Sequence, residues 1–239
     1  MYKKLSATRA LITGASSGIG FACANKLAEN GFAQIIITAR TVDSLRYASH
    51  LIESRYPDVS VIPIRCDHAN EKDVEDLTIK LAAENQIPDT VIANIGDNPV
   101  HRLGPRKSAG ISASELLQTF STNLVNTHIL LAFLLKFFGR NGGRIALVGS
   151  QAFRYGVKGQ LPYNVSKSAL VGYKNTLVSE YGHKGVLCHL VNPGLVLNKR
   201  TETLRKKLTA AGCVSEAQVA ECIYDTLFQT SQNGIEIDI

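Results

Sequence analysis

The sequence predicts an α/β fold in which a doubly wound parallel sheet is covered by helices on both faces. Short apolar, β-branched segments alternate with longer segments of helical period, which is typical of repeated βαβ units. The apolar residues of 35–37 and of 146–148 run together without alternation, as expected for strands that are buried on both faces. We therefore predict a single sheet of about seven strands in the order 3-2-1-4-5-6-7.

The predicted elements alternate along the whole chain. Strands are expected near 8–13, 34–39, 59–65, 90–94, 143–149, 186–192 and 235–238. Helices are expected near 18–30, 43–55, 71–85, 114–138, 162–182 and 216–229, with a weaker one near 201–209. Because such sheets bind ligands beyond the carboxyl ends of their strands, functional residues should directly follow the strands.

Length and composition favour one globular domain over residues 1–239. The chain is 45% hydrophobic and 19% charged, and no linker-like or repeated segment divides it. The longest apolar stretch, 129–138, is interrupted by Lys136 and is far shorter than the ~20 residues that span a bilayer. Five cysteines without disulfide or metal-ligand spacing indicate reduced thiols in a cytoplasmic protein with no metal site.

The net charge of +6 argues only weakly for a nucleic-acid partner. The basic residues are scattered in small groups, and no groove-reading motif accompanies them. An anionic cofactor or substrate explains the charge equally well.

A glycine-rich turn joins the first predicted strand to the first helix. Residues 13–20 read TGASSGIG, which places glycines where the backbone turns tightly, approaches a pyrophosphate and packs against the sheet. The alternative is a tight strand-to-helix connection without a ligand. The flanking strand and helix favour a Rossmann-type cofactor site, whose predicted residues are Gly14, Ser16, Ser17, Gly18, Ile19 and Gly20.

The residue after the second strand distinguishes the two nicotinamide cofactors. Arg40 stands where an acidic residue would bind the ribose hydroxyls, and a guanidinium there suits a 2′-phosphate. We therefore expect NADPH/NADP+, with NAD the less favoured alternative. In that alternative Asp43 supplies the carboxylate, although Asp43 looks more like the cap of the following helix.

A phenol and an ammonium group lie one helical turn apart at Tyr163 and Lys167, on a helix expected to start after Pro162. A phenol of pKa near 10 is a poor base at neutral pH, and a nearby cation favours its ionised form. This pairing makes proton transfer to or from a substrate oxygen accessible. Taken alone, the pair could equally be a surface pair on an amphipathic helix.

Together, these motifs resemble the short-chain dehydrogenase/reductase family over nearly the entire chain. The resemblance rests on TGASSGIG, on Tyr163 with Lys167, on Ser150 placed 13 residues before Tyr163, and on Asn123. It implies that Ser150 binds the substrate oxygen and that Tyr163 exchanges its proton. Lys167 would bind the nicotinamide ribose and lower the tyrosine pKa, while Asn123 would hold a water in a proton relay.

The resemblance also implies further cofactor contacts. Asp67 would meet the adenine, although a turn cap is nearly as good an interpretation of it. Backbone contacts beside the nicotinamide are implied for Asn94, Gly96, Pro193, Gly194 and Val196. Two departures are Ile95, where the family has a small residue, and Asn198, where the family usually has threonine; the reason for the bulk at Ile95 is not evident from the sequence.

The substrate is expected to bind between the loops 97–111, 151–161 and 195–212. These loops carry His101, Arg102, Arg106, Lys107, Phe153, Arg154, Tyr155, Lys158, Lys199 and Arg200. Such a cation-rich rim would suit an anionic or carrier-linked carbonyl compound, and solvated loop residues are the alternative.

The sequence thus predicts an NADPH-dependent oxidoreductase that reduces a ketone or aldehyde, with reverse alcohol oxidation possible. The alternative is a catalytically silent nucleotide-binding sensor or structural subunit on the same fold. The short segment after Gly234 weakly favours a homodimer over a tetramer.

Overall fold

The computed structural model describes residues 9–197 and 213–239, and a seven-stranded parallel sheet forms its centre. The sheet order is β3-β2-β1-β4-β5-β6-β9, which confirms the predicted order with β9 as the seventh strand. The strands are β1 (Arg9–Thr13), β2 (Gln34–Ala39), β3 (Ser60–Arg65), β4 (Thr90–Ala93), β5 (Gly143–Val148), β6 (Val186–Asn192) and β9 (Glu236–Asp238). The order reverses between β1 and β4, so a ligand crevice is expected at their carboxyl ends.

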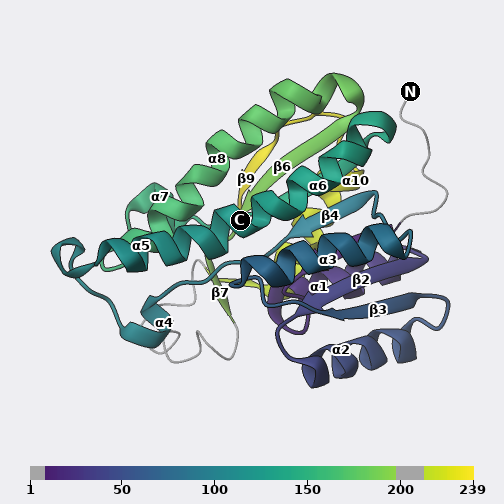
Figure 1. Ribbon diagram of the computed structural model, residues 1–239, viewed down its shortest axis with the longest axis horizontal. Coiled ribbons are helices and arrows are strands. Elements are labelled where there is room, and N and C mark those ends of the chain that lie inside the picture. The colour runs from purple at the N-terminus through teal and green to yellow at the C-terminus, as the bar shows by residue number, and fades with distance from the viewer. Residues whose placement is uncertain (1–8, 198–212) are drawn as a thin grey trace.

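Two helical layers bury both faces of the sheet (Figure 1). One layer contains α1 (Gly18–Glu29), α2 (Val42–Arg55) and α10 (Glu216–Phe228); the other contains α3 (Glu71–Ala83), α6 (Asn126–Asn141) and α8 (Leu161–Tyr181). Successive residues of β1 enter opposite cores, with Leu11 in one and Ala10 and Ile12 in the other. The apolar runs of the sequence therefore reflect strands covered on both sides, as predicted.

One long helix crosses the molecule from residue 113 to residue 141 (Figure 1). It consists of α5 (Ala113–Phe120), a π-helical turn η2 (Ser121–Val125) and α6. Ser112 and Glu115 form a capping box at its start, and Gly142, with φ of 75°, follows its end. The sequence predicted one helix over 114–138 without the π turn.

By length and composition, this long helix is apolar enough to cross a membrane, the one such helix among the described residues. Its most apolar window is half buried inside the protein, and the leucines of α6 belong to the core under the sheet. Core helices of globular proteins share these properties, so the helix is weak evidence for a membrane segment.

Several short elements were not predicted. The strands β7 (Leu195–Leu197) and β8 (Cys213–Ser215) pair in parallel outside the main sheet. The helices α4 (Val100–Leu103), η1 (Ser108–Gly110), α7 (Ala152–Tyr155) and η3 (Gly182–Lys184) lie in connections. The helix predicted at 201–209 lies outside the described residues.

Two predicted helix starts need correction. Thr41 is the N-cap residue of α2. Asp43 lies inside the first turn, where its carboxylate interacts favourably with the helix dipole but does not cap the helix. Helix α8 begins at Leu161, so Pro162 is within its first turn, where a missing N–H costs no hydrogen bond.

Candidate active site

A pocket of about 630 Å³ opens at the carboxyl ends of β1, β4, β5 and β6. Most of the site residues predicted from the sequence line it. They are Gly14, Ser17, Gly18, Ile19, Asn94, Gly96, Ser150, Tyr163, Lys167, Pro193, Gly194 and Val196. Ser16, Gly20, Arg40, Asp67 and Asn123 lie outside this lining.

The turn between β1 and α1 depends on the absence of side chains. Gly14 and Gly18 both have φ of 66°, in the region that favours glycine. A Cβ on Gly20 would lie 2.5 Å from the carbonyl oxygen of Gly14, so only glycine lets α1 approach the turn this closely. Ser17 is the N-cap residue of α1 but makes no side-chain cap. The first N–H groups of α1 therefore suit an anionic group such as a phosphate.

Asn94 fixes this turn to the end of β4. Its side-chain amide donates to the carbonyl oxygens of Thr13, at 3.1 Å, and Gly14, at 3.2 Å, while its backbone N–H donates to Thr13 Oγ1 at 3.0 Å. Ile95 packs over the same turn, since its Cδ1 would lie 3.0 Å from a Cβ on Gly14. The bulk at Ile95 thus fills space that glycine leaves open.

Arg40 directly follows β2, at the same sheet edge as the glycine turn. The backbone N–H of Ala15 donates to the carbonyl of Thr38 at 2.9 Å, which links the turn to the end of β2. Arg40 is exposed and forms no ion pair with any described residue. Its guanidinium is therefore available to a ligand at this edge.

Asp67 makes the turn-capping hydrogen bond that was the alternative interpretation of its position in the sequence. Its Oδ1 accepts from the N–H of Ala69 at 3.0 Å, and its own N–H donates to Asp73 at 2.8 Å. The neighbouring His68 is buried, and its Nε2 lies 2.8 Å from Thr38 Oγ1. His68 thus anchors this segment to β2, a role for which the sequence contains no signal, and the adenine contact of Asp67 stays a prediction.

Ser150, Tyr163 and Lys167 meet in the pocket although they come from two different elements. Ser150 follows β5, and its Oγ accepts from the N–H of Ala152 at 3.2 Å. Tyr163 and Lys167 lie in the first two turns of α8, and the Lys167 Nζ is 5.9 Å from the centre of the tyrosine ring. A hydroxyl, a phenol and an ammonium therefore surround one region of the pocket, as proton transfer to a substrate oxygen requires.

Burial dominates the acid–base properties of this group. It raises the pKa of Tyr163, and a hydrogen bond with Ser150 opposes that rise in part. Burial also lowers the pKa of Lys167 to about 8. The Nζ of Lys167 donates to the carbonyl oxygens of Val148, at 2.7 Å, and Ile95, at 3.3 Å. The hydrogen bond with Ser150 thus lowers the tyrosine pKa, and the same role for Lys167 stays a prediction.

The side chain of Asn123, in the π turn η2, is fully engaged with the protein. Its Oδ1 accepts from the N–H of Asp97 at 2.7 Å, while its Nδ2 donates to the carbonyl of Asp97 at 3.1 Å and to Ser166 Oγ at 2.9 Å. Asn123 therefore holds the loop after β4 against α8. Both N–H donors of this amide are used within the protein, and the relay role that the resemblance implied for Asn123 stays a prediction.

The cationic rim expected around the substrate is absent from the described part of the pocket. Its lining includes neither arginine nor acidic residues, and Lys167 is its one lysine. His101, which belongs to the expected rim, does line the pocket, together with three uncharged polar side chains that the sequence did not predict: Asn98, Gln151 and Gln160. Lys199, Arg200 and Asn198 lie outside the described residues.

A family model described as short chain dehydrogenase matches residues 8–209. The fold and the site together define a nicotinamide-binding oxidoreductase of the α/β type, and the match covers most of the chain. The protein therefore belongs to the short-chain dehydrogenase/reductase family, whose members bind nicotinamide cofactors and act on small-molecule substrates.

Curated relatives agree with this assignment. The chain is 31% identical over 199 residues to the 3-oxoacyl-(acyl-carrier-protein) reductase FabG of Buchnera aphidicola, covering 82% of this chain and 76% of the relative. It is 30% identical over 194 residues to the NADP-dependent 3-hydroxy acid dehydrogenase of Schizosaccharomyces pombe, covering 81% and 73%.

Solved structures share the fold over almost the whole chain. YwfH, an NADPH dependent reductase involved in bacilysin biosynthesis, superposes with a TM-score of 0.87 at 18% identity, covering 98% of this chain and 96% of that one. A 3-oxoacyl-(acyl-carrier protein) reductase with bound NAD from Brucella melitensis gives 0.85 at 22% identity, covering 97% and 89%. At these identities the similarity concerns the fold.

Proposed function

We propose that this protein is an NADPH-dependent reductase that converts a ketone or aldehyde to the alcohol, with Tyr163 as the proton donor. The observation that carries the proposal is the convergence of Ser150, Tyr163 and Lys167 on one pocket beside the glycine turn. A protein that only binds a nucleotide has no need of this combination.

The pocket fits a nicotinamide dinucleotide on its own geometry. The uncapped start of α1 and the close approach at Gly20 leave room for a pyrophosphate against the backbone. A Cβ on Gly96 would lie 2.8 Å from Lys167 Nζ, so the absence of a side chain at Gly96 leaves space beside the lysine ammonium for the cofactor. The exposed Arg40 after β2 supports NADPH over NADH, since Asp43 lies within α2. A relative named as NADP-dependent adds support.

The bound cofactor supplies a hydride to the carbonyl carbon. Tyr163 donates its phenolic proton to the carbonyl oxygen, so that the C=O bond becomes C–O–H, and the phenolate is then reprotonated from solvent. Ser150 Oγ donates a hydrogen bond to the same oxygen and stabilises the developing charge. The ammonium of Lys167 stabilises the phenolate and binds ribose hydroxyls. To bind them, it gives up its hydrogen bonds to the carbonyl oxygens of Val148 and Ile95.

Burial also determines the resting form of Tyr163. It raises the pKa of the phenol above the usual value near 10, so the group carries its proton at neutral pH. A protonated phenol is the form that donates to a carbonyl oxygen, whereas alcohol oxidation needs the phenolate. Near pH 7 the free protein therefore holds the form of Tyr163 that reduction requires.

The substrate class suggested by the relatives is a 3-oxoacyl compound or a 3-hydroxy acid, because two of them are named for such compounds. We propose a cytoplasmic homodimer as the working form, as the sequence predicted.

The test combines NADPH and NADH titration by fluorescence with NADPH oxidation against ketones, aldehydes, β-keto esters and β-ketoacyl thioesters. The variant Tyr163→Phe should lower kcat by about 10²–10⁴-fold, the usual contribution of a positioned acid, and should bind NADPH as before. Equal activity of Tyr163→Phe would contradict the mechanism. Tight NADPH binding by the wild type without turnover of any compound would favour the sensor or structural alternative.

A further inference from the structure

Among the described residues, the part of the pocket that faces the substrate is built from side chains without a permanent charge. The loops after β4 and β5 contribute Asn98, His101, Gln151, Tyr155, Val157 and Gln160 to the lining. The one lysine of this described lining, Lys167, is buried and held by two carbonyl oxygens. An anionic substituent bound against these residues would lose its hydration without gaining a free partner of opposite charge from them, which is costly.

The arginines of these loops are paired with acidic residues and do not line the pocket. Arg102 binds Asp97 at 2.7 Å, and Arg106 forms an ion pair with Glu115. Arg154 pairs with Glu236 and also with Asp238, so it connects α7 to the edge strand β9. Their positive charges are therefore used to fix the loops and are not available to a substrate.

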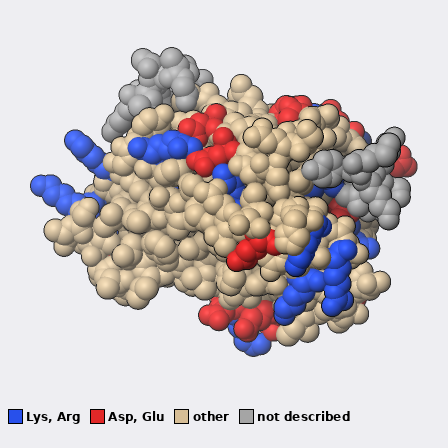
Figure 2. Space-filling model, turned by 90° about the horizontal axis from the view of Figure 1, so that it is seen from above, with Lys and Arg blue, Asp and Glu red and all other residues tan. Residues whose placement is uncertain are grey.

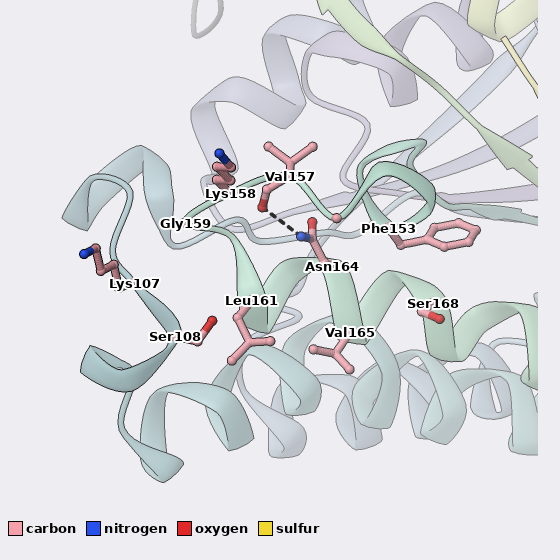
Figure 3. Close-up of a pocket in the computed structure, with 11 residues that line it drawn as sticks. Lys107, Ser108, Phe153, Val157, Lys158, Gly159, Leu161, Asn164, Val165 and Ser168 are labelled. Carbon is pink, nitrogen blue, oxygen red and sulfur yellow. Dashed lines mark hydrogen bonds between the residues drawn. The ribbon is translucent and has the colours of Figure 1, made fainter.

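The loop lysines belong to a neighbouring groove. Lys107 and Lys158 line a groove of about 680 Å³ on the outer side of α8, and their ammonium groups point away from Leu161 and Val165 on its apolar floor (Figure 3). More widely, the face in Figure 2 carries its basic side chains in small groups among acidic and uncharged ones. The lysines thus add no charge to the catalytic pocket.

A hydrogen-bonded wall separates the groove from the pocket. Asn98 Nδ2 donates to Gln160 Oε1 at 2.9 Å, and the N–H of Arg106 donates to the carbonyl of Gly159 at 3.4 Å. This contact leaves the Nε2 of Gln160 without a partner among the described residues, three positions before Tyr163. Gln160 and Tyr163 both line the pocket, so this wall adds an unpaired neutral N–H donor to the cavity that holds the catalytic phenol.

Apolar surface continues from this donor to the mouth of the pocket. Tyr155 is 74% exposed and Val157 is 38% exposed, although both line the pocket. Large exposed apolar side chains at a pocket mouth suit a hydrocarbon substituent of a ligand.

We propose that the substrate is an uncharged carbonyl compound with an apolar substituent, whose second polar group accepts a hydrogen bond from Gln160, and that the pocket discriminates against the corresponding carboxylate. Gln160 is then a specificity-determining residue. The proposal rests on the proposed reductase function and narrows its substrate class by charge.

The experiment compares two ester–acid pairs, whose members differ in one negative charge and in the ester alkyl group: ethyl acetoacetate with acetoacetate, and methyl para-formylbenzoate with para-formylbenzoate. The ester of each pair should have a kcat/KM at least about tenfold above that of the acid, which corresponds to about 1.4 kcal/mol. An acid that is reduced as well as its ester would overturn the proposal. If no carbonyl compound is reduced at all, the proposed function fails and this inference fails with it.

Two variants of Gln160 test whether this residue causes the preference for the ester over the acid. Gln160→Leu should raise the KM for ethyl acetoacetate while leaving that for butanone, which has no second carbonyl group, unchanged. Gln160→Arg should shift the ester-to-acid ratio towards the acid. The matched control is Lys158→Gln, which changes the groove and should leave the ratio as it is. A ratio that responds to Lys158→Gln but not to Gln160→Arg would overturn the assignment to the pocket wall.

Discussion

The nucleotide half and the substrate half of the pocket are stabilised in different ways. The nucleotide half depends mainly on close backbone contacts, such as the N–H of Ala15 on the carbonyl of Thr38 and the close approach at Gly20, with the Asn94 side chain joining the turn to β4. The substrate half is held by side chains of connecting loops, chiefly Asn98 with Gln160. The first arrangement tolerates almost no change of residue, whereas the second can be rebuilt one side chain at a time.

Gly20→Ala should have the largest effect, because it breaks the backbone-held half. The new Cβ would lie 2.5 Å from the Gly14 oxygen and 2.9 Å from Asn94 Nδ2, so α1 must move away from the turn. Strain of about 1–3 kcal/mol would weaken NADPH binding by about 10- to 100-fold. Fluorescence titration measures the affinity, and urea unfolding measures the free energy of unfolding.

A matched control for this change is Gly172→Ala, within α8. A Cβ there meets no atom within 4 Å, so alanine should raise the free energy of unfolding by about 0.5–1 kcal/mol and leave NADPH binding unchanged. Unaltered NADPH affinity in Gly20→Ala would show that the turn is less rigid than its geometry indicates.

Arg40→Asp should have the next largest effect, since it alters the nucleotide half without disturbing its backbone. Loss of a charge-assisted bond to a 2′-phosphate should lower the NADPH-to-NADH ratio of kcat/KM by about tenfold or more. Arg55→Asp, the same charge change at the far end of α2, serves as the control. Equal shifts in both variants would indicate a general effect of surface charge and would remove Arg40 from cofactor selection.

The smallest expected effect is the pH dependence of kcat/KM for NADPH. It depends on Lys167, which lies where the nucleotide half meets the substrate half. Burial lowers the pKa of Lys167 to about 8, so its ammonium is present below that pH and is lost above it. The kcat/KM for NADPH should therefore fall several-fold from about pH 7 to about pH 9, since this ratio reports the free enzyme. A profile that stays flat to about pH 10 would show that Lys167 keeps its proton.

The predictable part of the molecule follows the same division. The glycine turn and the Tyr163–Lys167 spacing are local patterns, and the alternation of strands and helices along the chain implies the strand order of a doubly wound sheet, so the sequence was sufficient to predict all three. The charge of the pocket was not predictable, because it depends on which acid each arginine meets: Arg154, for example, pairs with Asp238, 84 positions away. The raised pKa of Tyr163 likewise comes from burial by residues distant in sequence.

The π turn at Ser121–Val125 makes the position of Asn123 depend on the number of residues in the long helix. A π turn holds one residue more than an α-helical turn over nearly the same rotation. Deletion of one residue within this turn would therefore leave a continuous α-helix in which α5 and α6 keep nearly the same phase. The deletion would still displace the turn that carries Asn123 and brings its side chain to Asp97 and Ser166. A frame-preserving loss of one codon here would thus spare the core contacts of both helices and disturb the loop after β4.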